Sequence, residues 1–193
     1  MQLASYRLLG KQIATYESSQ TRAFLHGRTE TTRSVSHASE NFVKRMDMHP
    51  EGNETDALIR AEKIELLHRA CYSHAKYLRD AANGLGCDRH FFGLAMLVED
   101  GEPLPTLFRN ELFIRSKTWR LSTSTLPTCP GFGPVVEDGL GIGYHVFSDR
   151  FYFTITARKK NNFTVGAMSH LIEEALLEMQ RLVDLDGKSR SKL

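Results

Sequence analysis

The sequence lacks the features by which several classes of protein are recognised. It has 193 residues, and no apolar run reaches the roughly 20 residues that a membrane-spanning helix needs. The formal net charge is only +2, and no basic stripe carries interleaved aromatic residues, so nothing indicates nucleic-acid binding. Cys71, Cys87 and Cys129 have no CxxC spacing and are odd in number. We therefore expect neither a metal site nor a disulfide framework.

The remaining composition is that of a globular domain. Hydrophobic residues make up 41% of the chain and charged residues 25%, and the length is sufficient to bury a core. The first residues show neither the apolar core of a secretory peptide nor the arginines of a mitochondrial transit peptide. The last three, Ser191-Lys192-Leu193, match a peroxisomal address, at the end of a basic tail over 188–193.

Hydrophobic periodicity predicts alternating helices and strands. A helical stripe runs from Gln2 to Leu25, and Gly27 is expected to end it. Further helices are predicted over 36–46, 55–83, 88–98 and 163–185, and strands over 29–35, 119–126, 140–147 and 151–157. Ser148-Asp149 indicates a hairpin between the last two strands, and 107–113 is short and ambiguous. Three or four strands with these helices predict an α/β fold with helices packed on the sheet.

Three sequence blocks follow one another along the chain. They are YESSQTRAFLHGRTETTRS (16–34), GCDRHFFGL (86–94) and LSTSTL (121–126), and GFGPVVEDG (131–139) comes soon after the third. If LSTSTL is a strand, Ser122 and Ser124 share one face, because side chains alternate. Together the blocks resemble the C-terminal part of the choline/carnitine acyltransferase family, from about Leu3 to Leu185. LSTSTL and the TET triplet look more like the long-chain (palmitoyl) carnitine enzymes than the acetyl enzyme.

The resemblance implies a particular architecture. Residues 1–187 would form a chloramphenicol-acetyltransferase-like domain, a mixed sheet with helices packed on it. That domain would be the second half of a pseudo-symmetric two-domain enzyme, with the active site in a tunnel between the halves. The family's catalytic histidine and the lysines that hold the phosphates of coenzyme A belong to an upstream half, which has no match before Tyr16. We therefore expect this chain alone to be inactive, and only His26 and His90 merit testing as a replacement base.

The same resemblance implies roles for charged and hydroxyl side chains. Arg89 would hold the carboxylate of carnitine, for which a planar guanidinium is suited. The alternative for Arg89 is a surface ion pair with Asp88 or a nearby glutamate. Carnitine-contacting hydroxyls would come from Tyr16, Ser18, Thr29 and Ser122. Ser124 would act in catalysis by stabilising the oxyanion.

Apolar residues after the serine block complete the expected site. Phe132 and Val135 would face the trimethylammonium group of carnitine, since an aromatic face attracts such a cation. Pro130 and Gly131 would line the acyl pocket, where the acetyl enzyme carries a bulky methionine. Thr125 stands where the acetyl enzyme has a glutamine that touches coenzyme A. Both departures favour a medium or long acyl chain.

Two functions follow as alternatives. The first is the C-terminal half of a carnitine O-acyltransferase, with acyl-coenzyme A as co-substrate, no tightly bound cofactor, and the missing N-terminal half as partner. The second is a non-catalytic half-domain that keeps a partial carnitine site or packs on another protein. The final tripeptide predicts the peroxisome, and the resemblance to long-chain enzymes keeps the mitochondrion as the alternative.

Overall fold

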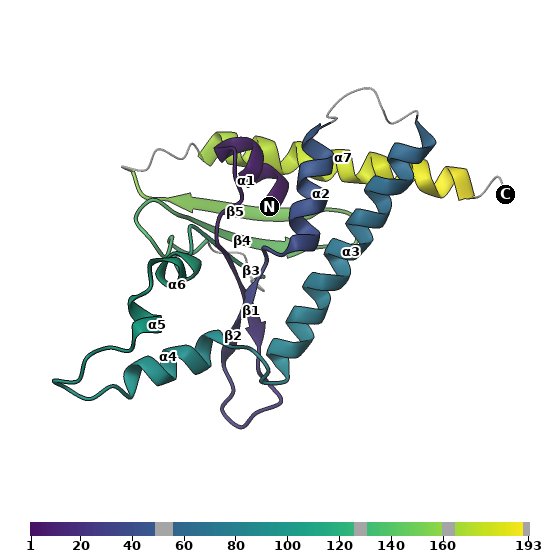
Figure 1. Ribbon diagram of the computed structural model, residues 1–193. Helices are drawn as coiled ribbons and strands as arrows, with labels where there is room; N and C mark the ends of the chain where they lie inside the picture. The colour runs from purple at the N-terminus through teal and green to yellow at the C-terminus, as the bar shows by residue number, and fades with distance from the viewer. Residues whose placement is uncertain (49–55, 126–130, 160–164, 191–193) are drawn as a thin grey trace. The chain divides into compact units, whose positions relative to one another are not determined.

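The structure is a computed structural model that describes residues 1–48, 56–125, 131–159 and 165–190 (Figure 1). Pro130 and the final tripeptide lie outside these residues. The chain divides into two compact units. We call them the helical unit (Met1–Ile13, Val35–Ala75 and Thr164–Leu193) and the sheet unit (Ala14–Ser34 and Lys76–Phe163).

The helical unit is built from amphipathic helices. These are α1 (Gln2–Leu9), α2 (His37–Met48), most of α3 (Ala57–Ala82) and α7 (Val165–Arg190). Helix α1 packs against both α2 and α7 (Figure 1). One apolar cluster holds the helices together, and its buried members are Leu3, Phe42, Val43, Met46, Ile64, Ala175 and Leu182. Beside this cluster, Arg7 donates two hydrogen bonds to Glu178, of 2.7 and 2.9 Å.

The prediction of one helix from Gln2 to Leu25 is wrong. Helix α1 ends after Leu9, because Gly10 adopts a left-handed conformation with φ 66° and its N–H bonds the carbonyl of Tyr6. Strand β1 follows at Thr15–Gln20, and its residues alternate between buried and more exposed. That period of two is the strand pattern, and it is short enough to be hidden within an apparent helical stripe.

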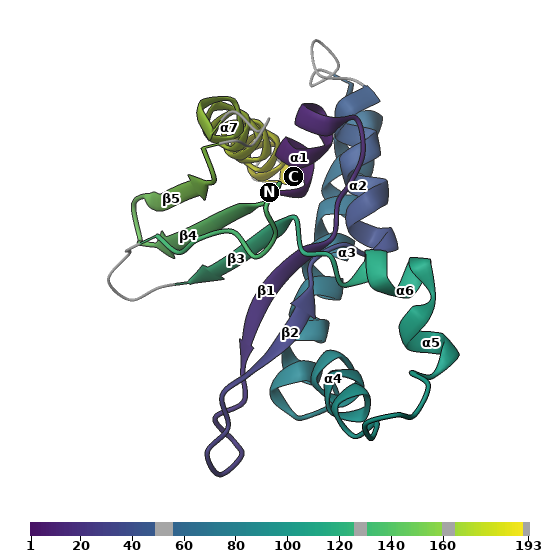
Figure 2. The same cartoon turned by 90° about the vertical axis from the view of Figure 1, so that its left-hand side faces the viewer.

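The sheet unit contains a five-stranded mixed sheet. Strand β1 is joined by β2 (Thr29–Arg33), β3 (Leu121–Thr125), β4 (Leu140–Val146) and β5 (Phe151–Ala157). The order is β2-β1-β3-β4-β5, in which the β1–β3 and β3–β4 pairs are parallel and the two outer pairs are antiparallel (Figure 2). The predicted α/β class and the β4–β5 hairpin are confirmed, with five strands in place of three or four.

Three shorter helices lie between the end of α3 and strand β3. They are α4 (Asp88–Met96), α5 (Thr106–Arg109) and α6 (Glu111–Ser116). Helix α4 contacts strand β2. Helix α6 begins where the side chain of Asn110 accepts hydrogen bonds from the backbone N–H groups of Leu112 and Phe113, as an N-cap residue does. The ambiguous segment over 107–113 therefore belongs to two short helices, which Asn110 separates.

Candidate functional site

The hydroxyl-bearing residues of β1 and β3 share one face of the sheet. Tyr16 pairs with Ser122 in the parallel β1–β3 ladder, and residues two further along each strand, Ser18 and Ser124, point the same way. Thr123 points to the opposite face. The predicted strand and the shared face of the two serines are confirmed. We call Tyr16, Ser18, Ser122 and Ser124 the hydroxyl face.

Three members of the hydroxyl face form a chain of contacts. The Tyr16 hydroxyl lies 3.4 Å from Ser18 Oγ, and Ser18 Oγ lies 3.4 Å from Ser124 Oγ. These distances are long for O–H···O bonds, which centre near 2.7–2.8 Å. Weakly paired hydroxyls can turn toward a ligand with little loss, so this face is suited to bind an anionic or polar group.

Arg89 lies at the start of α4 and reaches the hairpin formed by β1 and β2. Its Nε donates to the carbonyl of Thr29 at 3.1 Å, and one terminal nitrogen donates to Thr29 Oγ1 at 3.4 Å. By the β1–β2 register, Thr29 shares its face with Ser18. Arg89 is exposed and forms no ion pair within the described part of the chain. Its charge therefore remains available to an external carboxylate.

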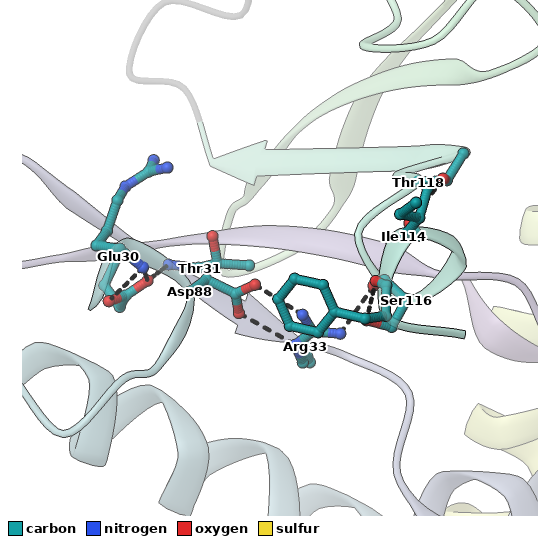
Figure 3. A network of polar contacts seen from close by, with 9 residues as sticks. Glu30, Thr31, Arg33, Asp88, Ile114, Ser116 and Thr118 are labelled. Atoms are coloured by element: carbon teal, nitrogen blue, oxygen red, sulfur yellow. Dashed lines mark hydrogen bonds and ion pairs between the residues drawn. The ribbon is translucent and has the colours of Figure 1, made fainter. Parts of the chain in front are cut away.

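Asp88 bonds Arg33, and not the Arg89 of the alternative interpretation. Figure 3 shows Arg33 of β2 between Asp88 and Ser116, which come from α4 and α6. Arg33 makes a bidentate pair with Asp88, of 3.0 and 2.7 Å, and donates to the Ser116 carbonyl at 2.8 Å. Burial lowers the pKa of Arg33, but the hydrogen bond and charge of Asp88 outweigh it, so the pKa is raised. The surface pair of Asp88 with Arg89 does not form.

Glu30 fixes the first turn of the same helix. Both oxygens of its carboxylate accept from the backbone N–H of Arg89, each at 3.3 Å, and Oε1 also accepts from the N–H of Thr31 at 2.6 Å (Figure 3). A carboxylate at a helix N-terminus satisfies free N–H groups and interacts favourably with the helix dipole. The first turn of α4 is therefore held at two points, by Arg33 on the Asp88 side chain and by the Glu30 carboxylate on the Arg89 N–H.

Gly131 and Phe132 lie on the sheet beside the hydroxyl face. The Phe132 carbonyl accepts a short hydrogen bond from Thr156 Oγ1 on β5. A Cβ on Gly141 of β4 would stand 2.2 Å from the same carbonyl, so only glycine permits this approach. A Cβ on Gly131 would likewise meet the methyl groups of Thr154 and Thr156, both at 2.9 Å.

Of the other predicted residues of this segment, the structure describes Phe132 and Val135 but not Pro130. The side chain of Val135 is exposed, and Phe132 is half-buried. Pro130 lies outside the described residues, so the two-residue acyl pocket is represented here by Gly131 alone. Their contacts with a trimethylammonium group or an acyl chain stay predictions.

Several positioning residues were missed by sequence reasoning. Glu30 and Asp88 stand next to the predicted site residues Thr29 and Arg89, and Arg33 lies in the same TETTRS block as Thr29. Trp119 was also missed; it lies under the Arg33 guanidinium at 4.9 Å and packs its ring edge against Tyr16 at 6.0 Å. Their signal was charge and aromaticity beside the predicted ligands, but only the fold reveals which acid meets which base.

Both candidate histidines are exposed. His26 is exposed and adopts a left-handed φ of 55°, and His90 is exposed beside the Phe91 ring. Within the described residues, no group of three His, Cys, Asp or Glu side chains could hold a metal ion. Among the described helices, none has both the length and the apolar character needed to cross a membrane.

Comparison with known proteins identifies the family. The model of the choline/carnitine O-acyltransferase family matches residues 1–174, so the chain belongs to this family. Carnitine O-acetyltransferase of Columba livia is 38% identical over 196 residues, covering 98% of this chain and 30% of that protein. Peroxisomal carnitine O-octanoyltransferase of Bos taurus is 37% identical over 193 residues, covering 96% of this chain and 30% of that protein.

The relatives also include a long-chain enzyme. Carnitine O-palmitoyltransferase 2, mitochondrial, of Xenopus tropicalis is 40% identical over 154 residues, covering 77% of this chain and 22% of the relative. The chain thus spans about 30% or less of the length of these relatives. They include acetyl, octanoyl and palmitoyl enzymes, from the mitochondrion and the peroxisome. The expected family is therefore confirmed, and the relatives do not single out one acyl chain length or one compartment.

Proposed function

We propose that this chain carries the carnitine-binding and oxyanion-stabilising part of a carnitine O-acyltransferase. The observation that carries the proposal is the contact chain from Tyr16 through Ser18 to Ser124, in which hydroxyls from two strands converge on one face. An acyl transfer between a thioester and the carnitine hydroxyl passes through a tetrahedral oxyanion. Preorganised hydroxyl donors stabilise such an anion without a change in net charge.

The proposed roles follow from charge and reach. Arg89 binds the carboxylate of carnitine, and Thr29, which already contacts its guanidinium, contributes a neutral donor beside it. Tyr16, Ser18 and Ser122 complete the polar contacts to carnitine, while Ser124 faces the developing oxyanion. Arg33 is excluded from substrate binding because its donors are engaged by Asp88 and Ser116.

Phe132 and Val135 are proposed to face the trimethylammonium group, with Pro130 and Gly131 at the acyl pocket. The close approach of the Phe132 carbonyl to β4 and β5 supports a fixed position for this segment. Thr125 and Pro130 favour medium or long acyl chains over acetyl. One buried methylene contributes about 0.8 kcal/mol, so the preference should grow over several carbons.

The whole enzyme is proposed to be longer than this chain. Residues 1–187 would be its second chloramphenicol-acetyltransferase-like domain, pseudo-symmetric with a first that supplies the general base and binds coenzyme A. The length of the relatives supports this, since the chain covers 30% of the acetyl- and octanoyltransferases. Residues 188–193, of which 188–190 are the last residues of α7, would carry a peroxisomal address, and the mitochondrion is the alternative location.

A second function, a non-catalytic half-domain that packs on a partner, is supported by apolar exposure. Side chains of the α4–α6 region stand open, among them Phe92, Met96, Leu97 and Leu112. Large exposed apolar areas mark interaction surfaces. The activity experiment below separates the two functions.

The experiment uses two forms of the protein. The 193-residue chain should give no carnitine-dependent release of thiol from palmitoyl-coenzyme A above the blank. The form extended upstream to the length of its relatives should be active, and Ser124→Ala should lower its kcat by about 10²–10³-fold. Ser148→Ala, in the exposed turn between β4 and β5, is the matched control and should leave the rate unchanged. An extended form with no activity would favour the half-domain. A robust rate from the short chain that His26→Ala or His90→Ala abolishes would contradict the prediction that this chain lacks the general base.

Arg89 gives a test of substrate assignment. In the extended protein, Arg89→Ala should raise the KM for carnitine by about 10–100-fold, because a hydrogen bond to a charged group contributes about 1.5–3 kcal/mol. The KM for acyl-coenzyme A should change little. Arg109→Ala, an exposed arginine of α5, is the control. Equal effects on both substrates would point to a structural role for Arg89.

A further inference from the structure

Glu17 is a buried acid that the proposed chemistry does not use. It stands between Tyr16 and Ser18 on β1, so its side chain points to the face of the sheet opposite the hydroxyl face. Only 7% of the residue is exposed. The hydroxyl of Tyr144 on β4 donates to Glu17 Oε1 at 3.1 Å, and Thr123 Oγ1 on β3 makes a short contact with Oε2.

The hydrogen atoms of this cluster can be counted. Thr123 Oγ1 also lies 2.7 Å from the backbone carbonyl of Tyr16, in hydrogen-bond geometry. A threonine hydroxyl has one hydrogen, a carbonyl has none to give, and an ionised carboxylate only accepts. If Glu17 were ionised, its carboxylate and the Tyr16 carbonyl would compete for the single hydroxyl hydrogen of Thr123. One of the two contacts would then bring two oxygen atoms together with no hydrogen between them.

If Glu17 carries a proton, each of these contacts has one donor and one acceptor. The Tyr144 hydroxyl then donates to Oε1, the Oε2 hydroxyl of Glu17 donates to Thr123 Oγ1, and Thr123 donates to the Tyr16 carbonyl. Every oxygen in this line is satisfied, as buried polar groups require. We propose that Glu17 is a neutral carboxylic acid in the folded chain and a positioning residue for the hydroxyl face.

The surroundings favour the neutral form. Burial raises the pKa of Glu17 against the opposing effect of the hydrogen bonds from Thr123 and Tyr144. Burial, and then the neighbouring Glu17, also raise the pKa of Tyr144, which keeps that hydroxyl a donor. By strand alternation, the titratable groups that the five strands place on this face are Glu17, Tyr144 and Glu30. Glu30 directs its carboxylate to the N–H groups of Thr31 and Arg89.

The line of hydrogen bonds acts on the other face through the backbone. It joins β1, β3 and β4 at the level of Thr123, whose neighbours in the chain are Ser122 and Ser124. It also holds the carbonyl of Tyr16, the first residue of the hydroxyl contact chain. A shift of β1 against β3 would separate Ser18 Oγ from Ser124 Oγ, so the proton on Glu17 helps to maintain the register that brings them together.

Carbon-13 NMR of the intact 193-residue chain, labelled in glutamate side chains, tests the protonation state directly. At pH 6 an exposed glutamate, with an ordinary pKa of about 4.3, is ionised. We expect one carboxyl resonance to retain the chemical shift of a protonated acid at pH 6. It should be absent from Glu17→Gln and displaced in Tyr144→Phe, which removes the donor to Oε1, so the assignment does not depend on one variant.

The positioning role has a separate readout. The backbone amides of Ser122, Thr123 and Ser124 should titrate with the same midpoint as the Glu17 carboxyl in the wild type. In Glu17→Gln, which keeps a donor and an acceptor without an ionisable proton, these amides should not titrate.

Glu178 provides the matched control. It is an acid of the helical unit whose carboxylate accepts two hydrogen bonds from Arg7. Glu178→Gln should lower the midpoint of thermal unfolding by more than about 2 °C, while Glu17→Gln should lower it by less. A carboxylate chemical shift for every glutamate at pH 6 would overturn the proposal. If the amides of Ser122, Thr123 and Ser124 do not change with the Glu17 titration, the positioning role is wrong and Glu17 is only a buried acid.

Discussion

The two compact units of this chain differ in how many polar side chains they bury: among the described residues the sheet unit buries many, the helical unit only Ser5 and Lys63. In the helical unit the interior is a cluster of leucine, isoleucine, valine, methionine and phenylalanine, and its main ion pair, Arg7 with Glu178, lies beside that cluster. In the sheet unit the buried set includes Glu17, Glu30 and Asp88 together with threonines and serines of β1, β2 and β3. Apolar packing is non-directional, whereas buried hydrogen bonds fix orientation. The sheet unit is therefore the one suited to hold a precise arrangement of donors.

The largest expected effect on stability is in the apolar interior of the helical unit. Phe42 of α2 is 6% exposed within the apolar cluster. Phe42→Ala should lower the free energy of unfolding by about 3–5 kcal/mol, because it removes buried surface and leaves a cavity. Urea denaturation followed by circular dichroism measures the change. Leu58→Ala, at an exposed position of α3, is the control and should change the stability by less than about 0.5 kcal/mol.

The next largest effect is expected in the sheet unit. Asp88→Asn should cost about 2–3 kcal/mol, because it leaves the half-buried Arg33 without its counter-charge. Asp149→Asn removes an exposed acid paired with Arg150 and should cost at most about 1 kcal/mol. The same denaturation measurement compares them. If the two variants were equally stable, the Arg33–Asp88 pair would be no more than a surface contact.

The smallest effect concerns the start of α4. Glu30→Gln should cost about 1 kcal/mol, because it weakens the capping of the Arg89 N–H. Amide hydrogen exchange at the first turn of α4 should accelerate. Glu111→Gln, at the exposed first turn of α6, should accelerate exchange less, since the N-cap there is Asn110. Unchanged exchange in α4 would mean that Asp88 alone orders the turn.

Much of the fold was predictable because the strongest signals are local. The long helix α3, strand β3 and the β4–β5 hairpin followed from periodicity and turn residues. The first helix was overextended because six strand residues cannot be told from helix by a few apolar positions. Local signals also placed Ser122 and Ser124 on one face.

The arrangement of the site was harder to predict because it depends on distant pairing. The blocks supplied the residues, but no local pattern shows that Asp88 meets Arg33, or that Glu17 meets Tyr144, 127 positions away. From the sequence, the only partner considered for Asp88 was its neighbour Arg89, and that pair was the alternative to carnitine binding by Arg89. The packing of α4 on β2 pairs Asp88 with Arg33, and that packing is a property of the whole fold.

The parallel pairing of β1 with β3 also bears on when the hydroxyl face can form. Ser18 and Ser124 are 106 positions apart, so their contact requires the closure of a long loop. The entropic cost of that closure grows with loop length, and proteins rich in such non-local contacts fold slowly. During synthesis, β1 leaves the ribosome well before β3 exists. The hydroxyl face is therefore a late product of folding, completed only after the intervening helices have been made.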